Sequence, residues 1–98
     1  MAGRAKAIVI NERDNVATAL VALPAGAAVT LTLQGRKEKV PVRSAVPMGH
    51  KFALREIPPG AEVVKYGEAI GKASAPIGRG EHVHVHNVAS RRWQKGGA

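Results

Sequence analysis

The sequence repeats itself at a spacing of 34 residues, and this repeat limits the possible folds more than any other feature. The segment "ALVALPAGAAV" (19–29) aligns with "ALREIPPGAEV" (53–63), and both read Ala-Leu-x-x-aliphatic-Pro-x-Gly-Ala-x-Val. A shortened copy recurs at Ile77, Gly80 and Val83. The proline presets φ for the second position of a β-turn, and the glycine accepts the position where the chain leaves it. Each copy therefore predicts a strand, a tight corner and a second strand.

Two full copies are too few for a solenoid, which needs about three or more repeats, so the repeat indicates pseudo-symmetry inside one small all-β domain. A chain of 98 residues is most simply one domain. Because Phe52, Tyr66 and Trp93 are the only aromatic residues, the core must be built from aliphatic side chains. We expect a domain over 1–90. The basic segment 91–98 is expected to be a partly disordered tail, or one that docks onto another subunit through Trp93.

Strands are predicted where β-branched residues and alternation coincide. The predicted strands are Ala5–Ile10, Val16–Leu23, Val29–Leu33, Glu38–Val42, Lys51–Ile57, Glu62–Tyr66 and His82–Val88. The segment 15–23 is ambiguous, because Asp14 and Asn15 could cap a helix there. The repeat favours a strand, and a turn-stabilising role for these two polar residues.

Composition narrows the function classes. The chain has no cysteine, which excludes disulfides and thiolate chemistry, and its first fifteen residues have too short an apolar run for a signal peptide, so we expect a cytoplasmic protein without a membrane partner. The net charge of +8 favours an anionic partner, either a nucleic acid, an acidic protein or a carboxylated substrate. Because no aromatic-rich RNA-binding signature accompanies the basic residues, we do not expect nucleic-acid binding.

The segment "GEHVHVHNV" (80–88) places His82, His84 and His86 at alternate positions. In a strand these side chains share one face, with Cα atoms roughly 6.5–7 Å apart, which permits two imidazoles to chelate one metal ion. The alternative is a half-exposed strand whose polar face happens to be imidazole, and the residues alone favour that alternative.

A second candidate is "PMGHKFAL" (47–54), where a glycine precedes His50 and Lys51 at the start of a strand. A loop at such a place can present both side chains to a ligand. Lys51 could hold a carboxylate, and His50 could transfer a proton near neutral pH. Taken singly, a surface lysine is more often merely solvated.

The order of these motifs resembles the SAF-type domain of the altronate and galactarate dehydratase family, whose relatives include the small subunit of sulfolactate sulfo-lyase. The resemblance rests on "DNVATAL", "LPAG", "PMGHKFALREIPPGAEVVKYGEAIGKASAPIGRG" and "GEHVHVHN", and it covers roughly 5–90. It implies a β-clip fold. It also implies that this chain is the separate small subunit of an enzyme whose large subunit carries most of the catalytic apparatus.

The implied reaction is β-elimination of water from a sugar acid, with a divalent metal, Fe²⁺ or Mn²⁺, as Lewis acid. Such a reaction needs stabilisation of enolate-like charge and a general acid for the leaving hydroxide. The resemblance implies that the catalytic residues are His50, Lys51, His84, His86 and Asn87, that His84 and His86 bind the metal, and that His82 is a bystander. Release of sulfite from sulfolactate and a non-catalytic carbohydrate- or metal-binding module are the alternatives, and self-association is left open.

Overall fold

The computed structural model describes residues 5–90, and nine short strands lie within this range. They are β1 (Ala7–Ile8), β2 (Val16–Ala19), β3 (Ala28–Leu33), β4 (Arg36–Pro41), β5 (Lys51–Ala53), β6 (Glu62–Lys65), β7 (Glu68–Ala73), β8 (His82–Val83) and β9 (Val88–Ser90). All the pairings between them are antiparallel. The predicted all-β class is confirmed, and within this range there is no helix that could cross a membrane.

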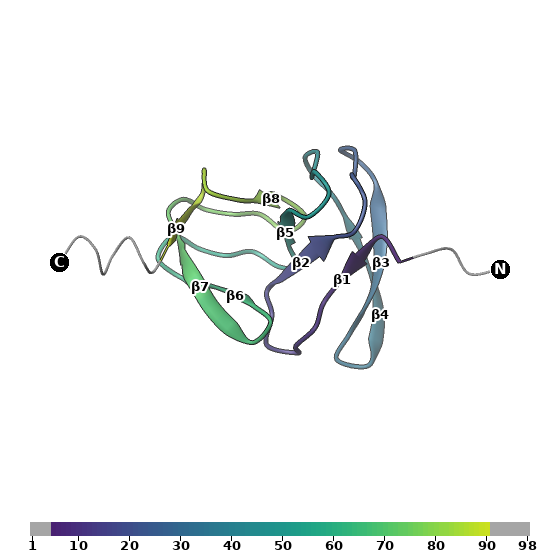
Figure 1. The fold of residues 1–98 in the computed structure, drawn as a ribbon, viewed down its shortest axis with the longest axis horizontal. Coiled ribbons are helices and arrows are strands. Elements are labelled where there is room, and N and C mark those ends of the chain that lie inside the picture. The colour runs from purple at the N-terminus through teal and green to yellow at the C-terminus, as the bar shows by residue number, and fades with distance from the viewer. Residues whose placement is uncertain (1–4, 91–98) are drawn as a thin grey trace.

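The strands form three layers. A central sheet with the order β1-β2-β5-β8 has the hairpin β3-β4 on one side and the sheet β6-β7-β9 on the other (Figure 1). Alternation along the central strands fills two separate cores, because neighbouring residues point to opposite faces. The pair Ala17 and Phe52 joins the first core, with β3 and β4, whereas the pair Val16 and Ala53 joins the second core.

The corners predicted from the repeat are present, but each proline occupies a different turn position from the predicted one. The backbone N–H of Ala27 donates to the carbonyl of Pro24, at 3.1 Å, so Pro24 is the first residue of the turn. Gly26 is then the third residue, where a type II turn requires positive φ, and its φ is +91°. The turn beginning at Pro58 has the same bond, at 3.0 Å. Proline was expected one position later, where its fixed φ is commonly used.

A corner that the repeat did not predict lies at residues 46–50. His50 N–H donates to the Pro47 carbonyl at 3.0 Å, and Gly49 has a φ of +85°. The third predicted copy forms a corner of the same kind, in which Glu81 N–H donates to the Gly78 carbonyl at 3.0 Å. The signal for the unpredicted corner was the string Val-Pro-x-Gly, which matches the core of the repeat without its flanks.

The corners associate in pairs with identical backbone hydrogen bonding. Leu23 bridges to Val46 in the first pair, and Ile57 bridges to Ile77 in the second. Each turn glycine then donates its N–H to the carbonyl four residues before the partner's bridging residue. These bonds run from Gly26 to Val42, from Gly49 to Ala19, from Gly60 to Ala73 and from Gly80 to Ala53, at 2.7–2.8 Å. This shared pattern confirms the predicted pseudo-symmetry.

The hairpins carry the symmetry further. The β3-β4 turn is Gln34-Gly35 and the β6-β7 turn is Tyr66-Gly67, and all four residues have positive φ. Two-residue turns of this kind match the twist of antiparallel strands. Strand β7 was not predicted, because "EAIGKA" is poor in β-branched residues. Its Gly71 is required by packing, since a Cβ there would collide with the backbone of Ala89.

Several predicted strands were too long. The predicted strand Val16–Leu23 ends at Ala19, and Lys51–Ile57 ends at Ala53, because the corners begin there. The regular strand predicted over His82–Val88 is wrong: β8 stops at Val83, a turn follows, and β9 begins at Val88. The predicted tail 91–98, with Trp93, lies outside the described residues.

The ambiguous segment after Asp14 contains a strand, as the repeat indicated. The buried Asp14 carboxylate accepts hydrogen bonds from the backbone N–H groups of Asn11 and Gly67. The Asn15 side chain accepts from Val64 N–H at 2.7 Å and donates to the Glu62 carbonyl at 2.9 Å. These two residues therefore fasten the β6-β7 hairpin to the start of β2, which confirms their turn-stabilising role.

Candidate functional site

Two histidines from distant parts of the chain meet because β5 pairs with β8. His50 is the last residue of its corner, directly before β5, and His82 opens β8 opposite Phe52. This pairing brings His50 Nδ1 within 2.9 Å of His82 Nε2, so one of these nitrogens donates a hydrogen bond to the other. The structure therefore brings His82, predicted to be a bystander, into direct contact with a predicted site residue.

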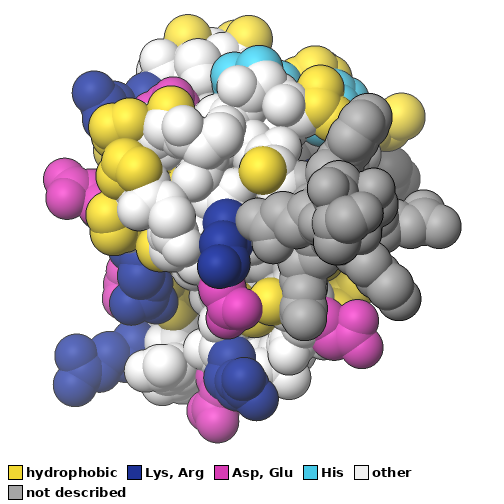
Figure 2. Space-filling view, turned by 90° about the vertical axis from the view of Figure 1, so that its left-hand side faces the viewer, with side chains coloured by type: hydrophobic (Ala, Val, Ile, Leu, Met, Phe, Trp, Pro, Cys, Tyr) yellow, Lys and Arg dark blue, Asp and Glu magenta, His cyan; other side chains and the backbone are white. Residues whose placement is uncertain are grey.

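His84 completes a cluster of three imidazoles. Its ring stacks on the His50 ring, with 4.0 Å between centroids and 14° between planes. One ring nitrogen from each of His50, His82 and His84 lies within 4.8 Å of the others. His84 Nδ1 is buried and makes no hydrogen bond within the described residues. Figure 2 shows histidine side chains gathered along one edge of the molecule, with hydrophobic side chains beside them.

The turn after β8 positions His84, and Asn87 holds this turn. Asn87 N–H donates to the His84 carbonyl at 3.0 Å, which closes a β-turn over 84–87. The Asn87 side chain, only 3% exposed, accepts from His84 N–H through Oδ1 and donates to the His82 carbonyl through Nδ2, both at 2.9 Å. A role for Asn87 in the site required the strand to end before it, and the strand does end there. Its amide contacts the backbone of two site histidines.

His86 occupies the tip of the same turn and lies outside the cluster of three. Its side chain is exposed, and its ring centroid is 5.2 Å from that of His82. Regular strand geometry would have placed it on one face with His82 and His84. The turn changes its direction, and His86 is not among the three described histidines whose ring nitrogens lie close enough together to hold one metal ion.

Burial and neighbouring groups favour the neutral form of His82 and His84. Burial lowers the pKa of His84 below its ordinary value, and the charges of His50, Lys51 and His86 lower it further. Burial also lowers the pKa of His82, and the second-largest cause of this lowering is the neighbouring His86. Neutral imidazoles have the free lone pair that a metal ion needs, because protonation removes it.

Lys51 lies beside the cluster at the edge of a small hollow of about 120 Å³. The hollow is lined by Lys51, Ile70, His84, Val85 and Val88. Burial, followed by the charge of Lys65, lowers the pKa of Lys51. An amine and an imidazole in a mostly apolar hollow can hold one polar end of a small molecule, such as a carboxylate.

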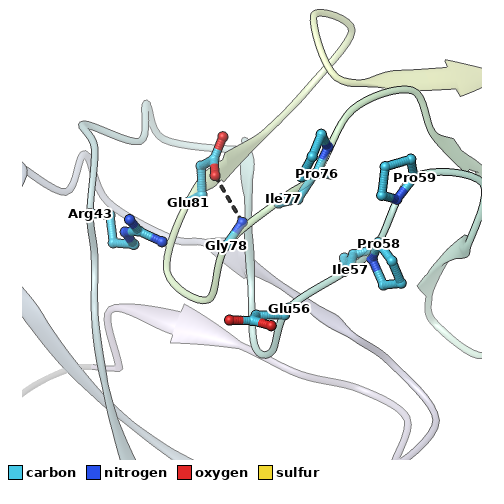
Figure 3. A pocket seen from close by; sticks show the side chains of 9 residues that line it. All are labelled: Arg43, Glu56, Ile57, Pro58, Pro59, Pro76, Ile77, Gly78 and Glu81. Atoms are coloured by element: carbon cyan, nitrogen blue, oxygen red, sulfur yellow. Dashed lines mark hydrogen bonds between the residues drawn. The ribbon is translucent and has the colours of Figure 1, made fainter.

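A second, larger hollow of about 560 Å³ lies between the paired corners that bridge Ile57 to Ile77. Its lining consists of Arg43, Glu56, Ile57, Pro58, Pro59, Pro76, Ile77, Gly78 and Glu81. Figure 3 shows the prolines at one end and Arg43, Glu81 and Glu56 at the other, with the Glu81 carboxylate accepting a hydrogen bond from Gly78 N–H. None of the predicted site residues lines it.

Comparison with known proteins decides the family. The model of the altronate/galactarate dehydratase SAF domain matches residues 5–91, nearly the whole chain. The chain belongs to this SAF domain family. The resemblance drawn from the motifs is thereby confirmed, and the SAF domain is related to lyases and dehydratases.

Among curated proteins, the SAF chain is 45% identical over 60 residues to (2R)-sulfolactate sulfo-lyase subunit alpha of Chromohalobacter salexigens, a match covering 61% of this chain and 64% of that protein. It is 49% identical over 81 residues to altronate dehydratase of Escherichia coli, covering 83% of this chain and 16% of that enzyme. Altronate dehydratase of Bacillus subtilis is 40% identical over the same length and coverage. The matched SAF segment is therefore part of each relative, and a small part of the dehydratases.

Sequence reasoning missed the participation of His82. The motif "HVHVH" makes the three histidines look equivalent, and nothing in it says which of them faces His50. That depends on the register of β8 against β5, which pairs His82 with Phe52. A prediction of this strand pair would have been the only route to it.

Proposed function

We propose that this chain is the small component of a metal-dependent lyase that eliminates water from a sugar acid of the altronate or galactarate type. One observation carries the proposal: three histidines converge on the surface of a SAF domain whose family is named for these dehydratases. The chain is proposed to contribute part of an active site, and a large catalytic subunit or domain contributes the rest.

The histidine cluster fits a divalent metal ion. Nitrogens bound side by side at 2.0–2.1 Å from an ion lie about 3.0 Å apart when the angle between them is a right angle. His50 Nδ1 and His82 Nε2 are 2.9 Å apart. The buried His84 Nδ1 has no hydrogen-bond partner among the described residues. We therefore propose His50, His82 and His84 as ligands for Fe²⁺ or Mn²⁺, which accept imidazole when carboxylates complete the sphere. The bound ion would supply Lewis acidity toward the substrate's oxygen atoms.

The remaining predicted residues surround this cluster. Lys51, at the hollow beside His84, is proposed to hold the substrate carboxylate as its counter-charge. His86, exposed at the turn tip, is proposed to donate a proton to the departing hydroxide as general acid. Asn87 is proposed to keep His82 and His84 in place through its two hydrogen bonds.

The test is reconstitution with the catalytic subunit from the same source and Fe²⁺ or Mn²⁺. We expect the complex to dehydrate altronate or galactarate, measured as formation of the 2-keto-3-deoxy product, and the isolated chain to be inactive. His84→Ala should lower kcat/KM by about 100-fold or more, because it removes a ligand. Titration of the isolated chain with Mn²⁺ should show weaker binding for the same variant.

His86→Ala is the matched control for metal binding, because it removes an imidazole from the same turn but outside the cluster. It should leave Mn²⁺ affinity of the isolated chain nearly unchanged and lower kcat in the complex. Equal loss of Mn²⁺ affinity in both variants would contradict the ligand assignment. Full activity of a His84→Ala, His86→Ala double variant in the complex would contradict the whole site.

Sulfite release from sulfolactate is the second candidate, and the similarity to sulfolactate sulfo-lyase subunit alpha supports it, since the match covers 64% of that protein. Both reactions are β-eliminations from a hydroxy acid, and they differ in the leaving group. The same complex supplied with sulfolactate separates them, because sulfite is detected by its reaction with a thiol reagent. Sulfite without any dehydration of sugar acids would favour this candidate.

A further inference from the structure

Two apolar side chains project into solvent beside the histidine cluster. Val85 is 82% exposed and Met48 is 68% exposed, which are the highest exposures among the large hydrophobic side chains of the described residues. Single exposed hydrophobic residues are ordinary on protein surfaces. These two differ because both belong to the turns that carry site histidines.

Both side chains are held on fixed backbone. Met48 is the second residue of the turn that ends at His50, and Gly49 supplies the positive φ of the third position. Val85 is the second residue of the turn 84–87, which the buried Asn87 fixes by three hydrogen bonds. Valine is not a residue that favours turns, so the local backbone does not explain it. A turn whose backbone is already fixed loses little backbone entropy on binding.

The other corners show what this position ordinarily holds. The residues equivalent to Met48 are Ala25, Pro59 and Arg79, which are small, rigid or charged. Among the corners in the described residues, only the one that ends at His50 presents a long, flexible apolar side chain at this position. Because the rings of His50 and His84 stack at 4.0 Å, the two turns lie side by side. Met48 and Val85 therefore project from adjacent turns at the edge of the proposed site.

We propose that Met48 and Val85 are the anchor residues by which the SAF chain docks onto the catalytic subunit or domain, so that docking closes the histidine cluster. This inference rests on the proposed function. The occupant follows from two observations. The cluster contains imidazoles and no carboxylate, so an Fe²⁺ or Mn²⁺ site built on it needs further ligands. In the dehydratase relatives the matched segment is 16% of the enzyme, so most of each enzyme lies outside this segment and can contact it.

The experiment measures the affinity of the full chain for the catalytic subunit from the same source, by sedimentation or calorimetry, without substrate. Val85→Asp and Met48→Asp should each weaken binding by about tenfold or more, as expected for central apolar anchors. Both positions are exposed, so folding should be preserved. The isolated variants should bind Mn²⁺ no more weakly than the wild-type chain, because an added carboxylate can only favour the cation, and this separates docking from damage to the cluster.

Ile10→Asp is the matched control, because Ile10 is 60% exposed but belongs to the segment after β1, away from both turns. It should leave affinity for the catalytic subunit unchanged. Unchanged affinity of both anchor variants would overturn the proposal, as would wild-type chain that does not bind the catalytic subunit. If the wild-type chain forms a homodimer and the anchor variants lose this homodimer but still bind the catalytic subunit, the surface belongs to a second copy of the chain. That result would also overturn the proposal. A complex that forms through these residues but lacks lyase activity would contradict only the proposed function.

Discussion

At the scale of single residues, Asn87 shows how a polar side chain can belong to a site through the backbone. The resemblance to the dehydratase family implied that it is a site residue. Its amide is buried and bonds to the main chain of His82 and His84, so it determines the position of both imidazoles. The sequence could indicate that Asn87 belongs with the histidines, but it could not indicate that its contacts are with backbone atoms.

Asn87→Ala should destabilise the fold by about 1–3 kcal/mol, because it leaves the partly buried His84 N–H and His82 carbonyl without their partner. It should also weaken Mn²⁺ binding, since the turn that positions His84 loses two of its hydrogen bonds. Urea unfolding gives the stability, and calorimetric titration gives the affinity.

Asn11→Ala is the control for this substitution. The Asn11 side chain makes one local hydrogen bond, to Arg13 N–H, which is exposed to solvent. Asn11→Ala should therefore lower the free energy of unfolding by less than about 1 kcal/mol and leave Mn²⁺ binding unchanged. Equal costs for the two variants would contradict the structural role assigned to Asn87.

At the scale of elements, the corner is the unit from which the molecule is built. The repeated string Pro-x-Gly predicted the corners after Leu23 and Ile57, because glycine is needed where φ is positive. Strand ends were predicted too far along the chain, since apolar residues continue into the corners and propensity does not indicate where backbone pairing stops. The corner before His50 and strand β7 were missed because their sequences depart from the repeat and from β-propensity.

Gly80→Ala should be more destabilising than Gly26→Ala. Both glycines have positive φ, so each substitution costs about 1–2 kcal/mol of backbone strain. A Cβ on Gly80 would in addition collide with the Pro41 carbonyl oxygen, whereas one on Gly26 meets nothing within 4 Å. The extra cost at Gly80 should be about 1–3 kcal/mol.

Thermal unfolding of the two variants measures this difference directly. Gly26→Ala acts as the internal control, because it carries the strain without the collision. If the two variants melted at the same temperature, the close approach of the corner to Pro41 would not be a feature of the folded chain.

At the scale of the whole molecule, one thin sheet separates two hydrophobic cores and contributes side chains to both. Central strands β2 and β5 place alternate residues in opposite cores. The internal repeat predicted pseudo-symmetry, and the matching corners and hairpins show it. It could not predict that the halves cover opposite faces of a common sheet, because that depends on long-range pairing between β2 and β5.

We expect the two cores to unfold together. Leu31→Ala in the first core and Ile57→Ala in the second should each lower the free energy of unfolding by about 2–4 kcal/mol. Because the central sheet belongs to both cores, each variant should still unfold in one transition. Hydrogen exchange of β3-β4 and β6-β7 amides, followed in urea, tests this.

Ile10→Ala serves as the control, since its exposed side chain contributes to neither core and should shift the midpoint little. Different midpoints for the β3-β4 and β6-β7 amides in a core variant would mean that the halves are separate cooperative units.

The pairing of the corners has a consequence for how this fold changes over evolutionary time. Main-chain hydrogen bonds fix each corner, and the side chain at the second turn position takes no part in them. That position already holds alanine, methionine, proline and arginine within one chain. Mutations there leave the main-chain bonds of the corner in place and act through what the side chain contacts, as Arg79 contacts Glu38 and the Leu54 carbonyl. Divergent members of the family can therefore acquire new surface contacts at their corners while the frame beneath stays the same.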